Sequence, residues 1–125
     1  MDLTPKVPAD RQVLEAYGDR GFRVSGRRFE GSLLVFPREV LPWPVSTMDE
    51  LSPESLGPMI ERAGEVEIML LGAGAAMAFV PAALRQHLKD HGIAVDVMDT
   101  GAACRTYNVL MAEDRRVAAA LIAVD

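Results

Sequence analysis

The chain has 125 residues, which is enough for one domain with a hydrophobic core, and its formal net charge is −5. Half of the residues are hydrophobic and a quarter are charged, which is the balance of a globular protein and not of a disordered one. The acidic balance argues against general nucleic-acid binding, which requires a basic face. A single cysteine excludes an intrachain disulfide framework and a zinc site built from several cysteines.

The N-terminal segment carries no secretory signal that we can identify. We expect residues 1–11 to form a flexible leader, with two prolines but no apolar core, and residues 12–125 to form a single α/β domain. The run Ile68–Leu84 has seventeen residues without a charge. It lies at the short end of the length that a membrane span requires, and it contains two glycines and a proline. We therefore expect a buried strand, loop and helix there, in a cytoplasmic protein without a transmembrane segment.

Short antiparallel strands are predicted for the first part of the domain. Turn residues at Gly18-Asp19-Arg20-Gly21 and at Ser25-Gly26 separate runs of apolar and β-branched residues. The predicted strands cover residues 13–17, 22–24, 27–30 and 32–36. Residues 37–47 carry no regular signal, and Trp43 lies there between two prolines. The indole is either a lid over the core or an exposed anchor in an interface.

Helices alternate with strands in the rest of the chain. Helices are predicted over residues 52–63, 81–91 and 100–113, and strands over residues 65–74, 93–98 and 116–124. Pro58 falls inside the first helix, which either restarts there or kinks. This alternation is typical of a parallel or mixed sheet with helices covering it.

Gly72-Ala73-Gly74 forms a tight loop at the end of the central apolar strand. It matches part of a dinucleotide-binding fingerprint, but Met77 stands where the third glycine belongs. The fingerprint also needs an acid at the end of the next strand, and Asp96 and Asp99 lie near that place. The loop either presents backbone N–H groups to an anion or serves only to reverse the chain tightly.

Asp99-Thr100 follows the next apolar strand and opens the last predicted helix. The carboxyl ends of neighbouring parallel strands meet at one edge of a sheet, so we expect this pair beside the glycine loop. Open α/β sheets bind their ligands at such an edge. The alternative is that Asp99 or Thr100 acts only as a helix N-cap.

Other candidate chemistry is weaker. His87 and His91 are spaced to share a metal, but Leu88 stands where a zinc protease has its glutamate. Cys104 lies near a helix start, which can lower a thiol pKa, although a small buried residue is the simpler interpretation. No Ser–His–Asp set, catalytic carboxylate pair or phosphate loop with lysine can be assembled. We therefore predict no catalytic residue, cofactor or metal.

Four arginines without an intervening acid lie in the predicted hairpin region. They are Arg20, Arg23, Arg27 and Arg28. Hairpin periodicity favours a solvated face for most of them. The alternative is a surface that meets an acidic partner or lipid headgroups.

Three segments in this order and spacing resemble a known family. They are Leu70–Gly74 with Pro81 seven residues later, Val97–Thr100 with Ala103, and Arg105–Leu110 followed by Arg115–Leu121. They are similar to the domain-of-unknown-function family that contains the mitochondrial complex I (NADH dehydrogenase) assembly factor 3 and the adipogenesis-associated Mth938-domain proteins. The resemblance runs from about Ala16 to Val124.

The resemblance implies a three-layer α/β fold, with a central mixed, mostly parallel sheet, helices on it, and an N-terminal antiparallel β-hairpin layer. It also implies no established enzymatic activity. The setting it implies is a bacterial-type cytoplasm, with a place at the inner membrane as one alternative. The family's recurrent residues would gather at one sheet edge: Gly72, Gly74, Pro81, Asp99, Thr100, Ala103, Tyr107 and Asn108.

We therefore predict a non-catalytic binding or assembly module whose protein partner belongs to a respiratory or membrane complex. Its predicted ligand or partner site comprises Gly72, Gly74, Pro81, Asp99, Thr100, Arg105, Tyr107, Asn108 and Trp43. One alternative is a small-molecule or anion-binding domain, or a cryptic enzyme, that uses the edge formed by the glycine loop and Asp99-Thr100. Another is a structural homo-oligomer whose glycine loop only packs. The ligand, the partner and the oligomeric state stay open.

Overall fold

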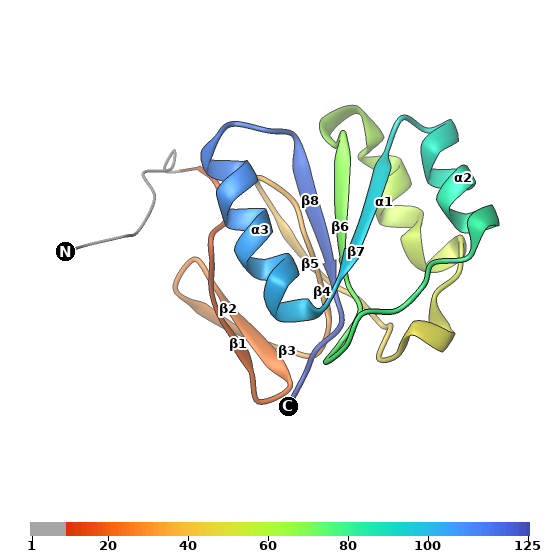
Figure 1. Cartoon of the computed structure of the whole chain (residues 1–125). Coiled ribbons are helices and arrows are strands. Elements are labelled where there is room, and N and C mark those ends of the chain that lie inside the picture. The colour runs from red at the N-terminus through yellow and green to blue at the C-terminus, as the bar shows by residue number, and fades with distance from the viewer. Residues whose placement is uncertain (1–9) are drawn as a thin grey trace.

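The computed structural model describes residues 10–125, so the predicted leader lies outside the described residues except for its last two positions. The described chain is arranged as two β-sheets with helices beside them (Figure 1). Short antiparallel strands come first, and helices alternate with strands afterwards. This order of elements confirms the predicted α/β class.

A three-stranded antiparallel sheet forms the N-terminal layer. Its strands are β1 (Leu14–Gly18), β2 (Gly21–Val24) and β3 (Arg27–Glu30), in the order β1-β2-β3. Ser25 and Gly26 have φ angles of +48° and +84°, as a two-residue type I′ hairpin turn requires at both positions. Phe22 and Val24 are buried whereas Arg23 between them is exposed, so one face of this sheet packs against the core.

A five-stranded mixed sheet forms the central layer. Its strands are β4 (Leu33–Val35), β5 (Val40–Pro42), β6 (Ile68–Gly72), β7 (Ala94–Met98) and β8 (Val117–Leu121), in the order β5-β4-β8-β6-β7. Strand β6 runs parallel to β7 and β8, whereas β4 runs antiparallel to β5 and β8. The sequence analysis missed β5, which is three residues long. It lies at a sheet edge, where Pro42 is tolerated because no outer strand needs its N–H.

Helices cover both faces of the central sheet. They are α1 (Gly57–Glu61), α2 (Ala82–Asp90) and α3 (Thr100–Ala112), with short 3₁₀ turns η1 (Met48–Glu50), η2 (Glu54–Leu56) and η3 (Ala63–Glu65). Helix α3 and the three-stranded sheet lie on one face, and α1 and α2 lie on the other, which gives the three predicted layers (Figure 1). Pro58 stands in the first turn of α1, where a missing N–H costs no hydrogen bond, so the helix restarts there. Within the described part of the chain, no helix has both the length and the apolar character that crossing a bilayer requires.

Trp43 belongs to the core. Its side chain is 4 % exposed, and Nε1 donates a hydrogen bond to the Ser55 carbonyl at 2.8 Å. The surrounding segment alternates, since Pro42 and Pro44 are exposed whereas Trp43 and Val45 are buried, as extended backbone directs side chains to opposite sides. The exposed indole anchor, one of the two sequence-based alternatives, is therefore wrong, and the indole covers the core.

The last residue of β6 requires glycine. A Cβ at Gly72 would lie 3.0 Å from Thr100 Cα, a backbone atom at the start of α3. We predict that Gly72→Ala lowers the free energy of unfolding by about 1–3 kcal/mol, because α3 must move away from the sheet. At Gly64 a Cβ meets open space, so Gly64→Ala is expected to change this free energy by less than about 1 kcal/mol. Urea denaturation followed by Trp43 fluorescence measures both, and equal losses would contradict the explanation.

Candidate functional site

The chain leaves β6, β7 and β8 at the same edge of the central sheet (Figure 1). Thr100, fully buried at the start of α3, connects these exits. Its backbone N–H donates to the Gly74 carbonyl at 2.9 Å, and its hydroxyl accepts from the Gly74 N–H at 3.0 Å. The same hydroxyl donates to the Ile122 carbonyl at 2.7 Å. The predicted adjacency of the glycine loop and Asp99-Thr100 is confirmed.

The polar groups of this junction are used within the protein. The Ala73 N–H donates to the Met98 carbonyl at 2.8 Å, and the Gly74 N–H is held by Thr100. Asp99 caps α3, because its Oδ1 accepts from the Ala102 N–H at 2.8 Å. The loop N–H groups of Ala73 and Gly74 are thus engaged, and a tight chain reversal accounts for the partial dinucleotide fingerprint.

Tyr107 and Asn108 hold the three-stranded sheet against α3. The Tyr107 hydroxyl donates to the Gln12 carbonyl at 3.1 Å. The Asn108 side chain bonds both backbone groups of Leu14, accepting its N–H at 3.0 Å and donating to its carbonyl at 2.6 Å. Burial raises the pKa of Tyr107 above its usual range, so the phenol stays a donor. The geometry gives both residues a structural place away from the sheet edge.

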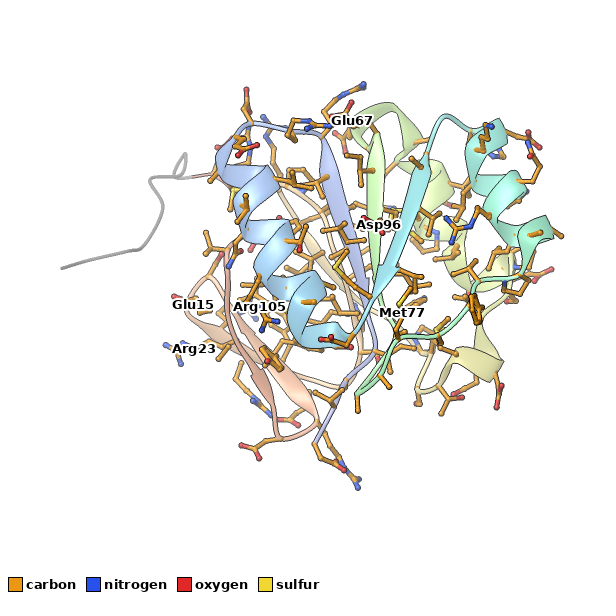
Figure 2. All side chains as sticks on the ribbon, in the orientation of Figure 1. Glu15, Arg23, Glu67, Met77, Asp96 and Arg105 are labelled. Atoms are coloured by element: carbon orange, nitrogen blue, oxygen red, sulfur yellow. The ribbon has the colours of Figure 1, made fainter. Side chains whose placement is uncertain are left out.

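Two further residues of the predicted site lie on the surface. Pro81 is exposed directly before α2, and Arg105 is exposed on α3. Arg105 Nη1 approaches the Tyr17 hydroxyl at 3.4 Å, on the side of α3 that faces the three-stranded sheet (Figure 2). Of the predicted set, the structure brings together Gly72, Gly74, Asp99 and Thr100. It leaves outside this group Pro81, Arg105, Tyr107, Asn108 and Trp43.

An open cleft of about 920 Å³ lies at this edge. Its walls come from the three-stranded sheet, the η1 segment, the glycine loop, the start of α3 and the residues after β8. Its charged lining residues are Arg20, Asp49, Asp99 and Asp125. Arg20 Nε donates to Asp125 Oδ1 at 2.8 Å. The glycine loop and the start of α3 are the two walls predicted from the sequence, whereas the other walls come from segments far apart in the chain.

The loop between β6 and α2 exposes apolar side chains. Residues 75–79, Ala-Ala-Met-Ala-Phe, are here called the apolar loop. Phe79 is 93 % exposed and Met77 is 68 % exposed. Figure 2 shows Met77 on this loop, near the sheet edge. The prediction that the uncharged run Ile68–Leu84 is buried throughout is wrong for this segment. The sequence feature that could have indicated this exposed apolar loop is the lack of any polar residue between a strand end and a helix start.

The arginine run is paired with acids or an aromatic ring. Arg20 pairs with Asp125, Arg23 with Glu15 at 3.5 Å, and Arg28 with Glu30 at 3.0 Å. The Arg27 guanidinium lies 5.3 Å from the centroid of the Phe29 ring. All four arginines are exposed. These contacts favour the solvated face over a basic docking surface.

The histidine pair and the cysteine have structural explanations. The His87 and His91 rings lie 5.1 Å apart, edge to face, and His91 Nδ1 lies 3.0 Å from the His87 carbonyl oxygen. Among residues 10–125, no three His, Cys, Asp or Glu side chains gather as a metal site. Cys104 is buried, and burial raises the pKa of its thiol to about 12. Burial therefore outweighs the helix start, which would lower this pKa.

Removing the Thr100 hydroxyl tests the junction. In Thr100→Val, the Gly74 N–H and the Ile122 carbonyl lose their buried partner, so we expect a loss of about 1–3 kcal/mol in the free energy of unfolding. Thr100→Ser keeps the hydroxyl and is expected to lose less. Denaturant titration compares the two variants, and a valine variant as stable as the serine variant would refute the assigned role.

The raised pKa of Cys104 predicts slow thiol chemistry in the native protein. Near pH 8, we expect labelling by a disulfide reagent to be on the order of a hundredfold slower in native than in denatured protein. As pH rises, the thiol of the unfolded chain, with a pKa of 9.0, loses its proton before the thiol of the native protein does. The contribution of Cys104 to the free energy of unfolding therefore falls as pH rises from about 9 to about 12. Absorbance kinetics measure the labelling, and fast labelling of native protein would show an accessible thiolate.

Comparison with known proteins shows relatives over nearly the whole chain. A family profile described as "Protein of unknown function (DUF498/DUF598)" matches residues 14–122. The chain is 39 % identical over 122 residues to the zebrafish (Danio rerio) NADH dehydrogenase [ubiquinone] 1 alpha subcomplex assembly factor 3, covering 98 % of this chain and 70 % of that protein. For several other animal relatives of the same name, the covered share of the relative is about 60 %.

Solved structures have the same fold. A Bartonella henselae structure described as an outer membrane protein has a TM-score of 0.86 and 36 % identity, covering 92 % of this chain and 97 % of that one. A Bordetella pertussis structure described as a Mth938-like domain has a TM-score of 0.84 and 28 % identity, covering 98 % of this chain and 92 % of that one. The chain belongs to the DUF498/DUF598 family, which includes complex I assembly factor 3 proteins and Mth938-like domains.

Proposed function

We propose that this chain is a non-catalytic protein-binding module that assists the assembly of a respiratory or other membrane complex. The relatives named as complex I assembly factors support this role, since the similarity to the zebrafish protein covers 98 % of the chain. In a bacterial-type cytoplasm, such a module would meet its partner subunits at the inner membrane. The binding partner is therefore a protein subunit, held before or during its insertion into a complex.

The apolar loop is the structural observation that carries this proposal. Its five residues contain no polar side chain, and the Phe79 ring is almost fully exposed. Burying such a side chain against a partner contributes about 1.5–3 kcal/mol of favourable transfer free energy, which the free protein does not gain while the side chain stays in water. An apolar surface segment of this kind marks a protein contact. A partner that covers Phe79 and Met77 would bury them.

A small-molecule-binding role is the second candidate, and the cleft favours it. Its volume of about 920 Å³ is in the range of ligand pockets, and it lies where open α/β sheets bind ligands. The carboxylates of Asp49 and Asp99 disfavour an anion there. A thermal-shift screen of uncharged and cationic metabolites addresses this candidate. Stabilisation that grows with the concentration of one compound would favour it.

The assembly role predicts that partners are lost when the apolar loop is made polar. We expect tagged Met77→Ser/Phe79→Ser protein to recover at least about tenfold less of the respiratory or membrane-complex subunits that the unchanged protein recovers. Val109→Ser is the matched control, because Val109 is 55 % exposed on α3, outside the loop. Quantitative mass spectrometry after gentle solubilisation measures recovery, and circular dichroism checks folding. Equal recovery by all three proteins, or no such subunit with the unchanged protein, would refute the proposal.

A further inference from the structure

We propose that the cleft at the sheet edge binds a basic, partly apolar peptide segment of the partner protein. This inference rests on the proposed function and adds the chemistry of the bound segment and the place where it lies.

The cleft keeps two negative charges that its own residues do not neutralise. Arg20 and Asp125 pair with each other at 2.8 Å. Within residues 10–125, neither Asp49 nor Asp99 has a Lys, Arg or His nitrogen within 4.0 Å. Arg105, the cation beside this edge on α3, contacts the Tyr17 hydroxyl and does not line the cleft. Charge complementarity therefore selects a cationic occupant and rejects an anionic one.

Local structure holds the Asp99 carboxylate and the backbone that carries Asp49. Asp99 Oδ1 accepts the Ala102 N–H at 2.8 Å, so the cap restrains the carboxyl group, and Asp99 lines the cleft. Asp49 lies in η1, whose entry is fixed by Glu50, because Glu50 Oε1 accepts the Ser46 N–H at 2.9 Å. The capped Asp99 carboxylate therefore loses little conformational entropy when an ammonium or guanidinium group binds.

Apolar side chains line the same cleft and connect it with the apolar loop. Met48, Ala73 and Ile122 contribute to its lining, and Ala75 belongs both to the cleft and to the apolar loop. A segment that lies in the cleft can therefore reach Ala75, the first residue of the apolar loop. The volume of about 920 Å³ exceeds what a single side chain fills and suits a few residues of peptide. Together, these features fit apolar residues interspersed with lysine or arginine.

Fluorescence anisotropy with defined peptides tests this inference on the full chain. The probe is a fluorescein-labelled nine-residue peptide that contains four lysines, with leucine and alanine at the other positions. Two further peptides replace all four lysines with glutamate or with serine. We expect the lysine peptide to bind about tenfold tighter than the serine peptide, and the glutamate peptide to bind most weakly. Added salt should reduce this difference.

Charge-removing variants locate the binding. Asp49→Asn/Asp99→Asn should weaken binding of the lysine peptide about fivefold to tenfold, and asparagine keeps the N-cap of α3. Asp96→Asn is the matched control, because this exposed residue lies part-way along β7, away from the carboxyl ends of the strands where the cleft lies (Figure 2). Met77→Ser/Phe79→Ser should also weaken binding, whereas Asp96→Asn should leave it unchanged.

Several outcomes would overturn the inference. Equal affinities for lysine and glutamate peptides, or binding that Asp49→Asn/Asp99→Asn leaves unchanged, would remove the cleft as the site. Tighter association with phosphatidylglycerol vesicles than with peptide would assign the surface to lipid. If sedimentation shows a dimer that Asp49→Asn/Asp99→Asn converts to a monomer, the cleft would be assigned to a second copy of this chain. Each of these leaves the recovery of complex subunits by the unchanged protein as a separate test of the proposed function.

Discussion

The buried hydroxyl of Thr100 accepts the Gly74 N–H at 3.0 Å and donates to the Ile122 carbonyl at 2.7 Å, so one side chain ties together the exits of three strands. This arrangement needs α3 to begin very close to β6, and only a residue without a Cβ at position 72 permits that approach. The course of the glycine loop, the start of α3 and the path of the chain after β8 all depend on this junction. All three segments also line the cleft.

The junction also decides what kind of chemistry the edge can offer. In a nucleotide-binding α/β protein, loop N–H groups at this place point toward phosphate. Here the N–H groups of Ala73 and Gly74 are bonded to Met98 and Thr100, and carboxylates line the cleft instead. The edge therefore combines a familiar ligand-binding location with an electrostatic character that suits a cation. An exposed phenylalanine on the adjoining loop adds apolar surface, which is the composition of a protein contact rather than of a phosphate site.

The residues that the family resemblance singles out have two different physical tasks in this chain. Gly72, Gly74 and Thr100 pack the sheet edge, whereas Tyr107 and Asn108 attach the three-stranded sheet to α3 through the backbone of residues 12 and 14. Both tasks shape the fold. Exposed ion pairs such as Arg115 with Glu67 occur elsewhere on the surface, and such pairs contribute little to stability.

The sequence by itself determined the elements whose signals are local. Positive-φ turn residues at Ser25-Gly26, the apolar runs of β6 and β7, and the helix after Asp99 follow from neighbouring residues, and their adjacency at one edge follows from parallel pairing. Tertiary structure alone decided the pairing of β5, the burial of Trp43, the exposure of Phe79 and the walls of the cleft. Each of these depends on which distant segment packs against a residue. An apolar side chain looks the same in sequence whether a partner segment covers it or leaves it in water.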